Sequence, residues 1–380
     1  MKKVVILQHR LLHYRMGLFN ELRKTCEARD INLHLAHGQP TKQEEKKRDV
    51  GTLPWADVVV NRYISIGSKD VLWQLFPAQH RDADLVIVMQ ENRLLSNYPW
   101  LFLRDLHKAK VAYWGHGRNF QTDRPTGFLE KWKKFLIGRV DWWFAYTNIT
   151  KDILLSDGYP AERLTVLDNA IDNEGFVADL SSINDTNLAK LRSELGLQQD
   201  SHVGLFCGSL YPDKRLDYMV AAADKIQAAL PDFHLLVIGD GPNVSLIKEA
   251  AVTRPWLHWL GVSKGIEKAG YFRLAHVIFN PGAVGLHILD SFCAGVPMVT
   301  TVDARHGPEI AYLEDGENGL VVQGDANDYA NVIIGLLQNP SRYAQLQAAA
   351  LASAQHYTLQ NMVERFADGI ERCLTMARKF

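Results

Sequence analysis

The stretch NPGAVGLHILDSFCAGVPMVTT, residues 280–301, passes from the end of an apolar strand through a turn with two glycines into a short helix. The helix carries a single acid, Asp290, and the tripeptide Gly-Val-Pro then opens a new apolar strand. A strand, a glycine turn, a helix and a second strand make up the repeating unit of a parallel sheet with helical crossovers. The stretch therefore predicts an α/β fold.

The same alternation runs along the rest of the chain. Apolar runs of about four to six residues recur without polar alternation, as expected for strands buried on both faces of a parallel sheet. Helical patterns lie between these runs. The expected strands are at residues 3–8, 31–38, 57–61, 84–90, 109–117, 141–147 and 164–170, and then at 202–208, 234–241, 276–280, 297–301 and 319–323. We expect two doubly wound α/β domains.

A chain of 380 residues is too long for one ordinary core. The polar segment 174–191 has no strand character and marks the expected boundary. We predict an N-terminal domain over 1–175 and a C-terminal domain over 176–355. A final helical segment, 356–380, is expected to pack back on the first domain.

Composition excludes several classes of protein. The net charge of −1 argues against nucleic-acid binding by bulk electrostatics. The four cysteines lie far apart with no CxxC pair, which argues against a disulfide framework or a zinc site and favours a reduced cytosol. No window approaches eighteen apolar residues, and the first apolar run is too short for a signal-peptide core. We expect a cytoplasmic protein, or one that is peripheral at the inner face of a membrane.

Glycine turns after three strands of the second half point to a ligand. They are GSLYPDKR (208–215), GDGP (239–242) and PGAVG (281–285). Parallel sheets bind ligands outside the carboxyl ends of their strands, where glycines let the backbone approach and helix starts favour anions. Lys214 and Arg215 add positive charge, so together the turns indicate a phosphate-bearing ligand.

Each feature alone has a plainer explanation. A GDG after a strand is usually only a tight connection. The pair Lys214 and Arg215 is equally consistent with a solvated surface, and Asp290 with an exposed helix acid. The order of the features within one domain is what favours a site.

That order resembles the retaining glycosyltransferases of family 4, which have the GT-B fold: two facing Rossmann-like domains with a cleft between them. Five elements occur in the family's order over about 120 residues, so chance agreement is improbable. They are the turn at 208–215, IGDGP (238–242), WLHWLGVS (256–263), the stretch 280–301, and GPEI with DGENGLVV (307–322). The first half matches through HGRN (116–119) and VLDNAID (166–172).

The resemblance implies a nucleotide-sugar donor, with no cofactor and no metal. Lys214 and Arg215 would stabilise the departing diphosphate, and Asp290 would accept hydrogen bonds from the ribose. The base would lie near Gly241 and Val262. The diphosphate would contact Gly208, Ser209, Gly285 and Leu286, and the sugar would face the loop Gly282–Leu286, which includes Val284.

The first domain would supply the acceptor site, for a glycan or lipid-linked acceptor. His116 follows an expected strand and would contact the donor sugar or support the transition state; a structural histidine is the alternative. Arg15 and Gly17 lie in the expected turn after the first strand, where they would reach the diphosphate, although Arg15 is equally consistent with a surface residue. The basic, aromatic segment 128–139 suits contact with an anionic membrane, or a helix with a core face and a solvated basic face.

Two departures from the family pattern keep other functions open. Gly282 stands where the family usually has a glutamate, and Ser209 where it usually has an arginine; a glutamate at 282 should alter donor choice if the loop faces the sugar. A non-catalytic nucleotide-sugar-binding subunit and a nucleotide-sugar epimerase of the same fold are the alternatives. A plain dehydrogenase is poorly supported, because neither half shows GxGxxG after its first strand.

Overall fold

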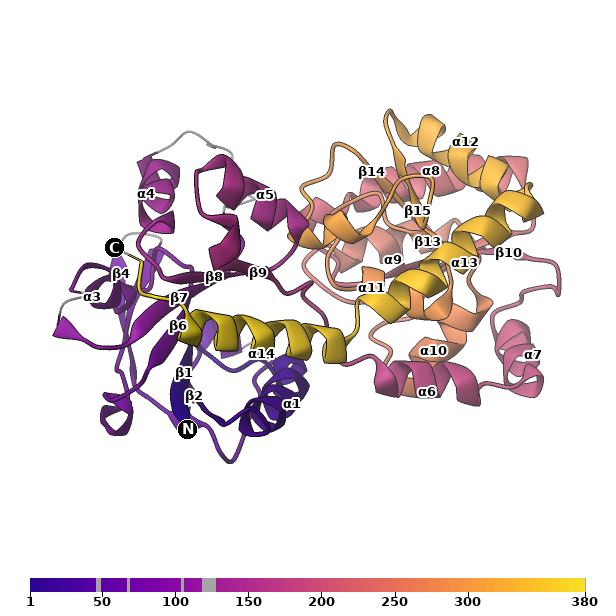
Figure 1. The fold of residues 1–380 in the computed structure, drawn as a ribbon. Helices are drawn as coiled ribbons and strands as arrows, with labels where there is room; N and C mark the ends of the chain where they lie inside the picture. The colour runs from indigo at the N-terminus through magenta and orange to yellow at the C-terminus, as the bar shows by residue number, and fades with distance from the viewer. Residues whose placement is uncertain (46–48, 67–68, 104–105, 118–127, 380) are drawn as a thin grey trace. The chain divides into compact units, whose positions relative to one another are not determined.

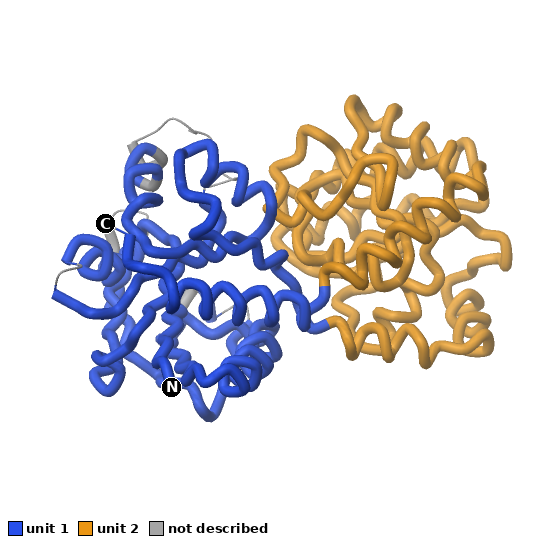
Figure 2. Tube along the Cα trace, in the orientation of Figure 1, with its two compact units in different colours: residues 1–172, 358–380 blue, residues 173–357 orange. Residues whose placement is uncertain are grey.

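A computed structural model describes residues 1–45, 49–66, 69–103, 106–117 and 128–379 (Figure 1). The chain divides into two compact units, coloured separately in Figure 2. Unit 1 contains Met1–Asp172 and Thr358–Phe380, and unit 2 contains Asn173–Tyr357. The chain therefore leaves unit 1 once and returns to it for the last helix.

The sheet of unit 1 is parallel throughout, in the strand order β3-β2-β1-β6-β7-β8-β9. Its central strands are apolar runs buried on both faces, as the sequence predicts. The strands are β1 (Lys2–Gln8), β2 (Ile31–His37), β3 (Asp57–Val58), β6 (Leu85–Met89), β7 (Lys110–Gly115), β8 (Trp142–Ala145) and β9 (Leu164–Val166). A separate antiparallel hairpin, β4 (Asn61–Ile66) with β5 (Lys69–Gln74), was not predicted.

The helices of unit 1 include the last one of the chain. They are η1 (His13–Arg15), α1 (Met16–Glu27), α2 (Lys42–Glu45), η2 (Ala78–His80), α3 (Asn97–Phe102), α4 (Phe128–Ile137), α5 (Asn148–Ser156), η4 (Ala161–Arg163) and α14 (Leu359–Thr375). Helix α14 packs against α1, and Arg29 pairs with Glu364 and Asp368 across that contact. Lys110 donates to the carbonyl oxygens of Cys373 and Leu374, both at 2.7 Å, which satisfies the end of α14.

The sheet of unit 2 is also parallel, in the order β12-β11-β10-β13-β14-β15. The chain runs outward from β10 through β11 and β12, then returns to β13 on the other side of β10. This reversal between β10 and β13 is where doubly wound sheets bind ligands. The strands are β10 (His202–Cys207), β11 (Phe233–Ile238), β12 (Leu257–Trp259), β13 (Val277–Phe279), β14 (Met298–Thr301) and β15 (Gly319–Val322).

Two groups of helices accompany this sheet. Helix α8 contacts α9 and α12, whereas α10 contacts α6, α7 and α11. The helices are α6 (Glu174–Ser182), α7 (Asp185–Glu194), η5 (Pro212–Lys214), α8 (Leu216–Ala229), α9 (Val244–Val252), α10 (Gly265–Leu274), α11 (Ile288–Ala294), η6 (Pro308–Tyr312), α12 (Ala326–Leu337) and α13 (Pro340–His356).

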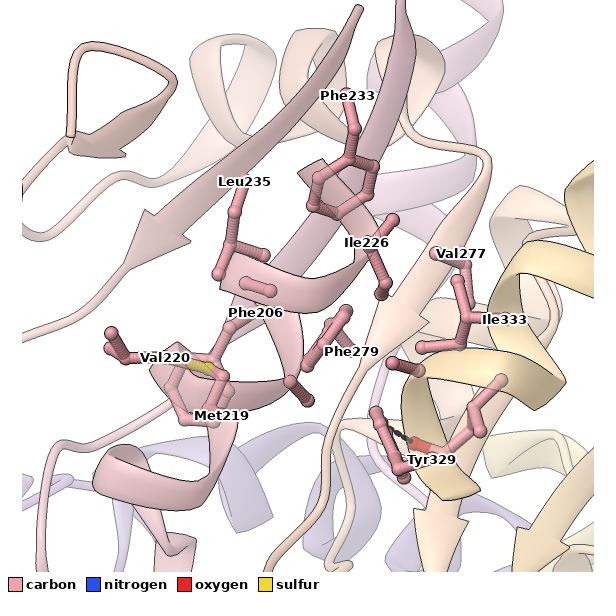
Figure 3. Close-up of a cluster of buried hydrophobic side chains, with 14 of the residues drawn as sticks. Phe206, Met219, Val220, Ile226, Phe233, Leu235, Val277, Phe279, Tyr329 and Ile333 are labelled. Carbon is pink, nitrogen blue, oxygen red and sulfur yellow. Dashed lines mark hydrogen bonds between the residues drawn. The ribbon is translucent and has the colours of Figure 1, made fainter. Parts of the chain in front are cut away.

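One core of unit 2 lies between the sheet and helices α8 and α12 (Figure 3). Phe206, Phe279 and Met219 are fully buried there. The hydroxyl group of buried Tyr329 donates to the carbonyl oxygen of Val299 at 2.6 Å, so its polar atom has a partner. Truncating a buried aromatic such as Phe279 to alanine would cost about 3–5 kcal/mol. This core fixes the carboxyl ends of the strands that carry the site.

Candidate functional site

The turns that follow β10, β11 and β12 pack backbone against backbone. The amide of Gly208 donates to Ile238, and the amide of Gly239 donates to Gly261, at 3.0 and 2.7 Å. Gly239 has a φ of +143°, and a Cβ atom there would lie 1.9 Å from the carbonyl oxygen of Gly208. Only glycine fits this position.

Gly241 permits a similar close approach two residues later. A Cβ atom at Gly241 would lie 2.4 Å from the carbonyl oxygen of Leu210. That oxygen accepts from the amide of Asn243, and the amide of Leu210 donates to Asp240, each at 3.0 Å. The glycines recognised in the sequence therefore let adjacent turns form one continuous backbone surface.

A pocket of about 450 Å³ opens on this surface, lined entirely by residues of unit 2. Of the residues predicted to bind the donor, Gly208, Ser209 and Val262 line it. The other lining residues are Phe176, Asp179, Cys207, Ile238, Gly239, Asp240, Ser263, Lys264, Gly265 and Lys268. The pocket combines backbone turns and two lysines, which suit an anionic group, with two aspartates, which can accept hydrogen bonds from hydroxyl groups.

Lys214 lies beside the first turn and is buried. A Cβ atom on Gly208 would lie 4.0 Å from its Nζ atom, and that ammonium donates to the carbonyl oxygen of Ala283. Burial lowers the pKa of Lys214 to about 8. The group therefore links the turn after β10 to the turn after β13, and a nearby anion would stabilise its charge.

Arg215 follows with a φ of +53°, a left-handed conformation that favours glycine. Its guanidinium group donates to the Thr301 hydroxyl at 2.8 Å and lies 4.3 Å from the ring centroid of Tyr218. The Thr301 hydroxyl in turn donates to the carbonyl oxygen of Pro281 at 2.8 Å. Arg215 thus acts on the start of the 281–286 turn through Thr301, and it does not line the pocket.

Gly282 has no room for a side chain. A Cβ atom would lie 2.4 Å from both the carbonyl oxygen of Asp213 and the Cα atom of Lys214. A glutamate at 282 would separate the two turns, so its effect on donor choice could not be attributed to a contact with the sugar. The amide of Ala283 also donates to Asp213 at 2.8 Å, so the glycine permits their direct contact.

The rest of that turn is held from the loop after β14. The amide of Val284 donates to His306 Nδ1 at 3.1 Å, and its carbonyl oxygen accepts from Gly307 at 2.8 Å. Gly285 and Leu286 are half-buried and lead into α11. The next residue, His287, was not predicted. Its pKa is lowered by burial and by Lys214 and Lys268, so its imidazole is neutral.

Asp290 is buried in α11 and pairs with Lys268 of α10, with Nζ and Oδ2 2.8 Å apart. Burial raises the pKa of this carboxyl group, and Lys268 opposes the rise. The exposed-acid alternative for Asp290 is therefore wrong. Lys268, which lines the pocket, was missed because a lone lysine in a helix gives no motif.

In unit 1, Arg15 is buried rather than on the surface. It donates to the Tyr146 hydroxyl at 2.8 Å, and its guanidinium carbon lies 4.4 Å from the centroid of the Trp114 ring. Its Nε and Nη1 atoms are buried without a hydrogen-bond partner among the described residues. Arg15 ends η1, and Gly17 is the second residue of α1 rather than a member of a turn.

His116 follows β7, as predicted. Its ring stacks on Tyr146 with the centroids 4.0 Å apart. The Gln90 side chain makes two hydrogen bonds to the backbone of Gly117 in the loop after β7. It accepts from the Gly117 amide at 2.9 Å and donates to the Gly117 carbonyl oxygen at 3.0 Å. Residues 118 and 119 of the HGRN motif lie outside the described residues.

A charged network that the sequence did not reveal lies beyond the ends of β1 and β6. It contains His9, Arg10, Glu44, Asp49, Glu91 and Arg93. Arg93 pairs with Glu91 at 2.8 Å, and Arg10 with Asp49 at 2.5 Å. Burial would raise the pKa of Glu44, but hydrogen bonds from Thr41 and the nearby cations hold the pKa at about 2. The network is rich in polar and charged groups, which suits a hydroxyl-rich ligand.

The segment 128–139 forms α4 and the turn after it. Lys131 and Lys134 are exposed, as is Phe135 at 48%. The guanidinium carbon of Arg139 lies 4.8 Å from the centroid of the Phe135 ring. Side chains of 128–130 and 133 lie outside the described residues. In the part of the chain described, no helix is both long enough and apolar enough to cross a membrane.

Solved structures with the same fold match almost the full length of the chain. A glycosyltransferase from Rickettsia africae has a TM-score of 0.71 at 14% identity, and the match covers 99% of each chain. Anabaena HepE in complex with UDP has a TM-score of 0.69 at 17% identity, covering 98% of this chain and 100% of that one. The likeness confirms the predicted GT-B fold of two Rossmann-like domains.

The sequence comparison finds a family similarity in the second half. Residues 201–339 match the family described as "Glycosyl transferases group 1". The D-inositol 3-phosphate glycosyltransferase of Stackebrandtia nassauensis is 29% identical over 261 residues, which are 61% of this chain and 56% of that protein. The chain spans about half the length of the curated relatives it matches. The resemblance of the second half to glycosyltransferases is confirmed.

Proposed function

We propose that the protein is a retaining glycosyltransferase that transfers a sugar from a nucleotide-sugar donor to a hydroxyl group of a glycan or lipid-linked acceptor. Surface polysaccharide or lipopolysaccharide biosynthesis is the setting we propose. The observation that carries the proposal is the pocket of unit 2, where glycine turns meet Lys264 and Lys268 next to buried Lys214. The UDP bound to Anabaena HepE supports a nucleoside diphosphate as the ligand class.

The proposed reaction breaks the bond between the anomeric carbon of the sugar and the β-phosphate oxygen. A new bond forms between that carbon and the acceptor oxygen on the same face, and the acceptor proton passes to the departing phosphate. Negative charge therefore grows on the diphosphate in the transition state. We propose that Lys214 and backbone amides stabilise that charge, that Arg215 supports them through Thr301 and the 281–286 turn, and that transfer needs no metal.

Lys214 suits this role because its charge responds to the ligand. With a pKa of about 8 in the unliganded site, it binds a proton more firmly once a diphosphate lies beside it. Asp290, oriented by Lys268, is the proposed ribose acceptor. The sugar faces the turn at 282–286 through backbone groups, since no side chain fits at Gly282.

For unit 1, we propose acceptor binding. The ionised network around Glu44 and Glu91 offers hydrogen-bond partners for acceptor hydroxyl groups. We propose that His116 contacts the donor sugar or supports the transition state. Exchange of His116 for alanine should lower kcat with little change in the melting temperature, whereas a structural histidine would lower both.

The test is a thermal-shift panel of UDP-, GDP-, ADP- and TDP-sugars, followed by an assay of nucleotide release with and without acceptor. A transferase gives a melting shift with one donor and acceptor-dependent release. Binding without release would indicate a non-catalytic subunit, and release with a 2-epimer in the absence of acceptor would indicate an epimerase. No shift with any donor would contradict the donor site itself.

We also propose a cytoplasmic protein that binds peripherally to an anionic membrane through 128–139. Exposed Phe135 and Lys131 on α4, with Phe102 41% exposed nearby, give the mixed aromatic and basic surface such contact uses. Co-sedimentation with vesicles containing phosphatidylglycerol should be lost in Phe135→Ser with Lys131→Ser. Equal sedimentation of the variant would contradict this contact.

A further inference from the structure

A cluster of His34, Asp57 and His80 lies in unit 1, separate from the charged network and from the pocket of unit 2. His34 is on β2, Asp57 starts β3, and His80 ends η2. Asp57 pairs with Ala36 in the parallel register, so it shares a face of the sheet with His34, two residues before Ala36. Among the described residues, this is the one group of three side chains placed so that they could hold a metal ion.

The three side chains are close together. His80 Nε2 is 2.7 Å from Asp57 Oδ2, and the ring centroids of His34 and His80 are 4.0 Å apart. One potential ligand atom from each residue lies within 4.8 Å of the other two. Ligand atoms around tetrahedral zinc are about 3.3 Å apart, given bonds of about 2.0–2.1 Å. Small side-chain rotations therefore suffice to close the site.

Two ring nitrogens of the cluster have unmet hydrogen-bonding capacity. His34 Nε2 and His80 Nδ1 are buried without a hydrogen-bond partner among the described residues. Buried polar atoms normally have partners, because leaving one without a partner costs free energy. A metal ion bound at His34 Nε2 would remove that cost for this atom.

Lys3 is one of two cations that act on His34 electrostatically. Lys3 is itself paired with Asp82 at 2.6 Å, which reduces its repulsion of a cation. Arg23 is the further cation that acts on His34.

The Asp57 carboxylate is held in place by a second partner. Gln79 donates to Asp57 Oδ1 at 2.9 Å, which leaves Oδ2 directed at His80. Partners of this kind commonly orient metal ligands. The Asp57 side chain is 30% exposed, so an ion has a route into the site.

We propose that His34, Asp57 and His80 form a binding site for zinc or a similar first-row divalent ion, with water as the fourth ligand. Two imidazoles and one carboxylate match the ligand preference of zinc better than that of magnesium or calcium. The ion would join β2, β3 and η2, and so stabilise the edge of the sheet in unit 1. No metal was expected from the sequence, because the ligands are about 23 residues apart and form no motif.

The site does not depend on the proposed function. Its test is titration of EDTA-treated protein with Zn²⁺ by calorimetry, and with Co²⁺ by visible absorption. We expect one ion per chain, a tetrahedral Co²⁺ spectrum and a rise in Tm of about 2–5 °C with excess Zn²⁺. Transfer activity should be the same before and after EDTA treatment. A negative result for zinc binding would therefore not contradict the proposed donor site.

The variants His34→Gln and Asp57→Asn come first, because both positions are half-buried and both replacements keep a polar group. Each should weaken Zn²⁺ binding at least about 100-fold, since loss of even an outer partner costs about 10–100-fold. The control is His258→Gln, from a histidine pair in unit 2 whose Nδ1 and Nε2 atoms are 3.0 Å apart. Absence of Zn²⁺ binding, or equal binding by wild type and both cluster variants, would overturn the proposal.

Discussion

In unit 2 the strands β10 and β11 are followed by Gly208 and Gly239, whereas in unit 1 the strands β1 and β6 are followed by His9 and Gln90. The sheet of unit 2 thus presents backbone at its carboxyl end, with lysines beside it. The sheet of unit 1 presents ionised and aromatic side chains. Both ends are where parallel sheets bind ligands, so we propose that the two units hold ligands of different chemistry.

Backbone amides and a few cations suit a diphosphate, which is the group shared by all nucleotide-sugar donors. Side chains such as Glu91 and Arg93 can be exchanged without disturbing the strands, which suits acceptors that differ from one enzyme to another. We therefore assign the binding of the diphosphate, which all donors share, to unit 2. We assign the binding of the acceptor, which differs between enzymes, to unit 1. Substitutions in each unit test that division.

The largest effect is expected at the closest backbone contact. Gly239→Ala places a Cβ atom 1.9 Å from the Gly208 carbonyl oxygen at a φ of +143°, so it should destabilise unit 2 by at least about 3 kcal/mol. Urea unfolding measures this change. Gly335→Ala, in α12 with open space around it, should be neutral or stabilising by up to about 1 kcal/mol. Similar unfolding midpoints for the two variants would show that the turns are not in contact.

Lys214→Met should lower kcat about 10²–10³-fold, because it removes a charge that acts on the leaving diphosphate. The folded structure should survive, since methionine fills the same buried space and removes a desolvated charge. Nucleotide release at saturating donor measures kcat, and Lys225→Met, an exposed lysine on α8, is the matched control. Wild-type turnover in Lys214→Met would remove this residue from the mechanism.

Lys268→Met leaves the Asp290 carboxylate buried without its cation. The expected loss of stability is about 2–3 kcal/mol, below the range for fully buried pairs because Lys268 is 21% exposed. Adding Asp290→Asn should restore most of this loss, so the two effects are not additive. Urea unfolding at pH 7 of both single variants and the double variant measures the coupling. If the stability losses of the two single variants add up in the double variant, Lys268 and Asp290 do not interact.

Donor affinity should fall as the pH rises above about 8. Burial lowers the pKa of free Lys214 to about 8, so above that pH the ammonium must regain a proton before it can bind the diphosphate. The dissociation constant of the donor should increase up to about tenfold per pH unit, and the dependence should vanish in Lys214→Met. Calorimetry between about pH 6.5 and 9.5 tests this; a wild-type profile that stays flat would contradict the assigned charge.

The smallest effect is predicted in unit 1. Arg15→Met removes a buried guanidinium group whose Nε and Nη1 atoms have no hydrogen-bond partner among the described residues, so stability should rise by about 1 kcal/mol. Transfer should fall at the same time if Arg15 contacts a ligand. Melting temperature and kcat/KM are measured together. A loss of stability would show that Arg15 is a structural residue held by Trp114 and Tyr146.

The sequence predicted the backbone component of the site and missed much of the side-chain component, for a physical reason. Glycines that follow apolar runs mark turns directly, so Gly208 and Gly241 were visible in a single chain. Lys268 and His287 act through neighbours that only the fold brings together. The sequence showed that Gly282 departs from the family pattern. It did not show the reason, which is that the backbone of Asp213 and Lys214 leaves no room for a side chain.

The central claim is that unit 2 binds the diphosphate of a nucleotide-sugar. A crystal structure with the nucleoside diphosphate of the best donor in the thermal-shift panel tests it most directly. We expect the diphosphate within hydrogen-bond reach of the amides of Gly208 and Ser209 and of the Lys214 ammonium, with the base in the pocket beside Val262. A nucleotide bound elsewhere, with the Lys214 ammonium still donating to Ala283 and not to the ligand, would contradict it.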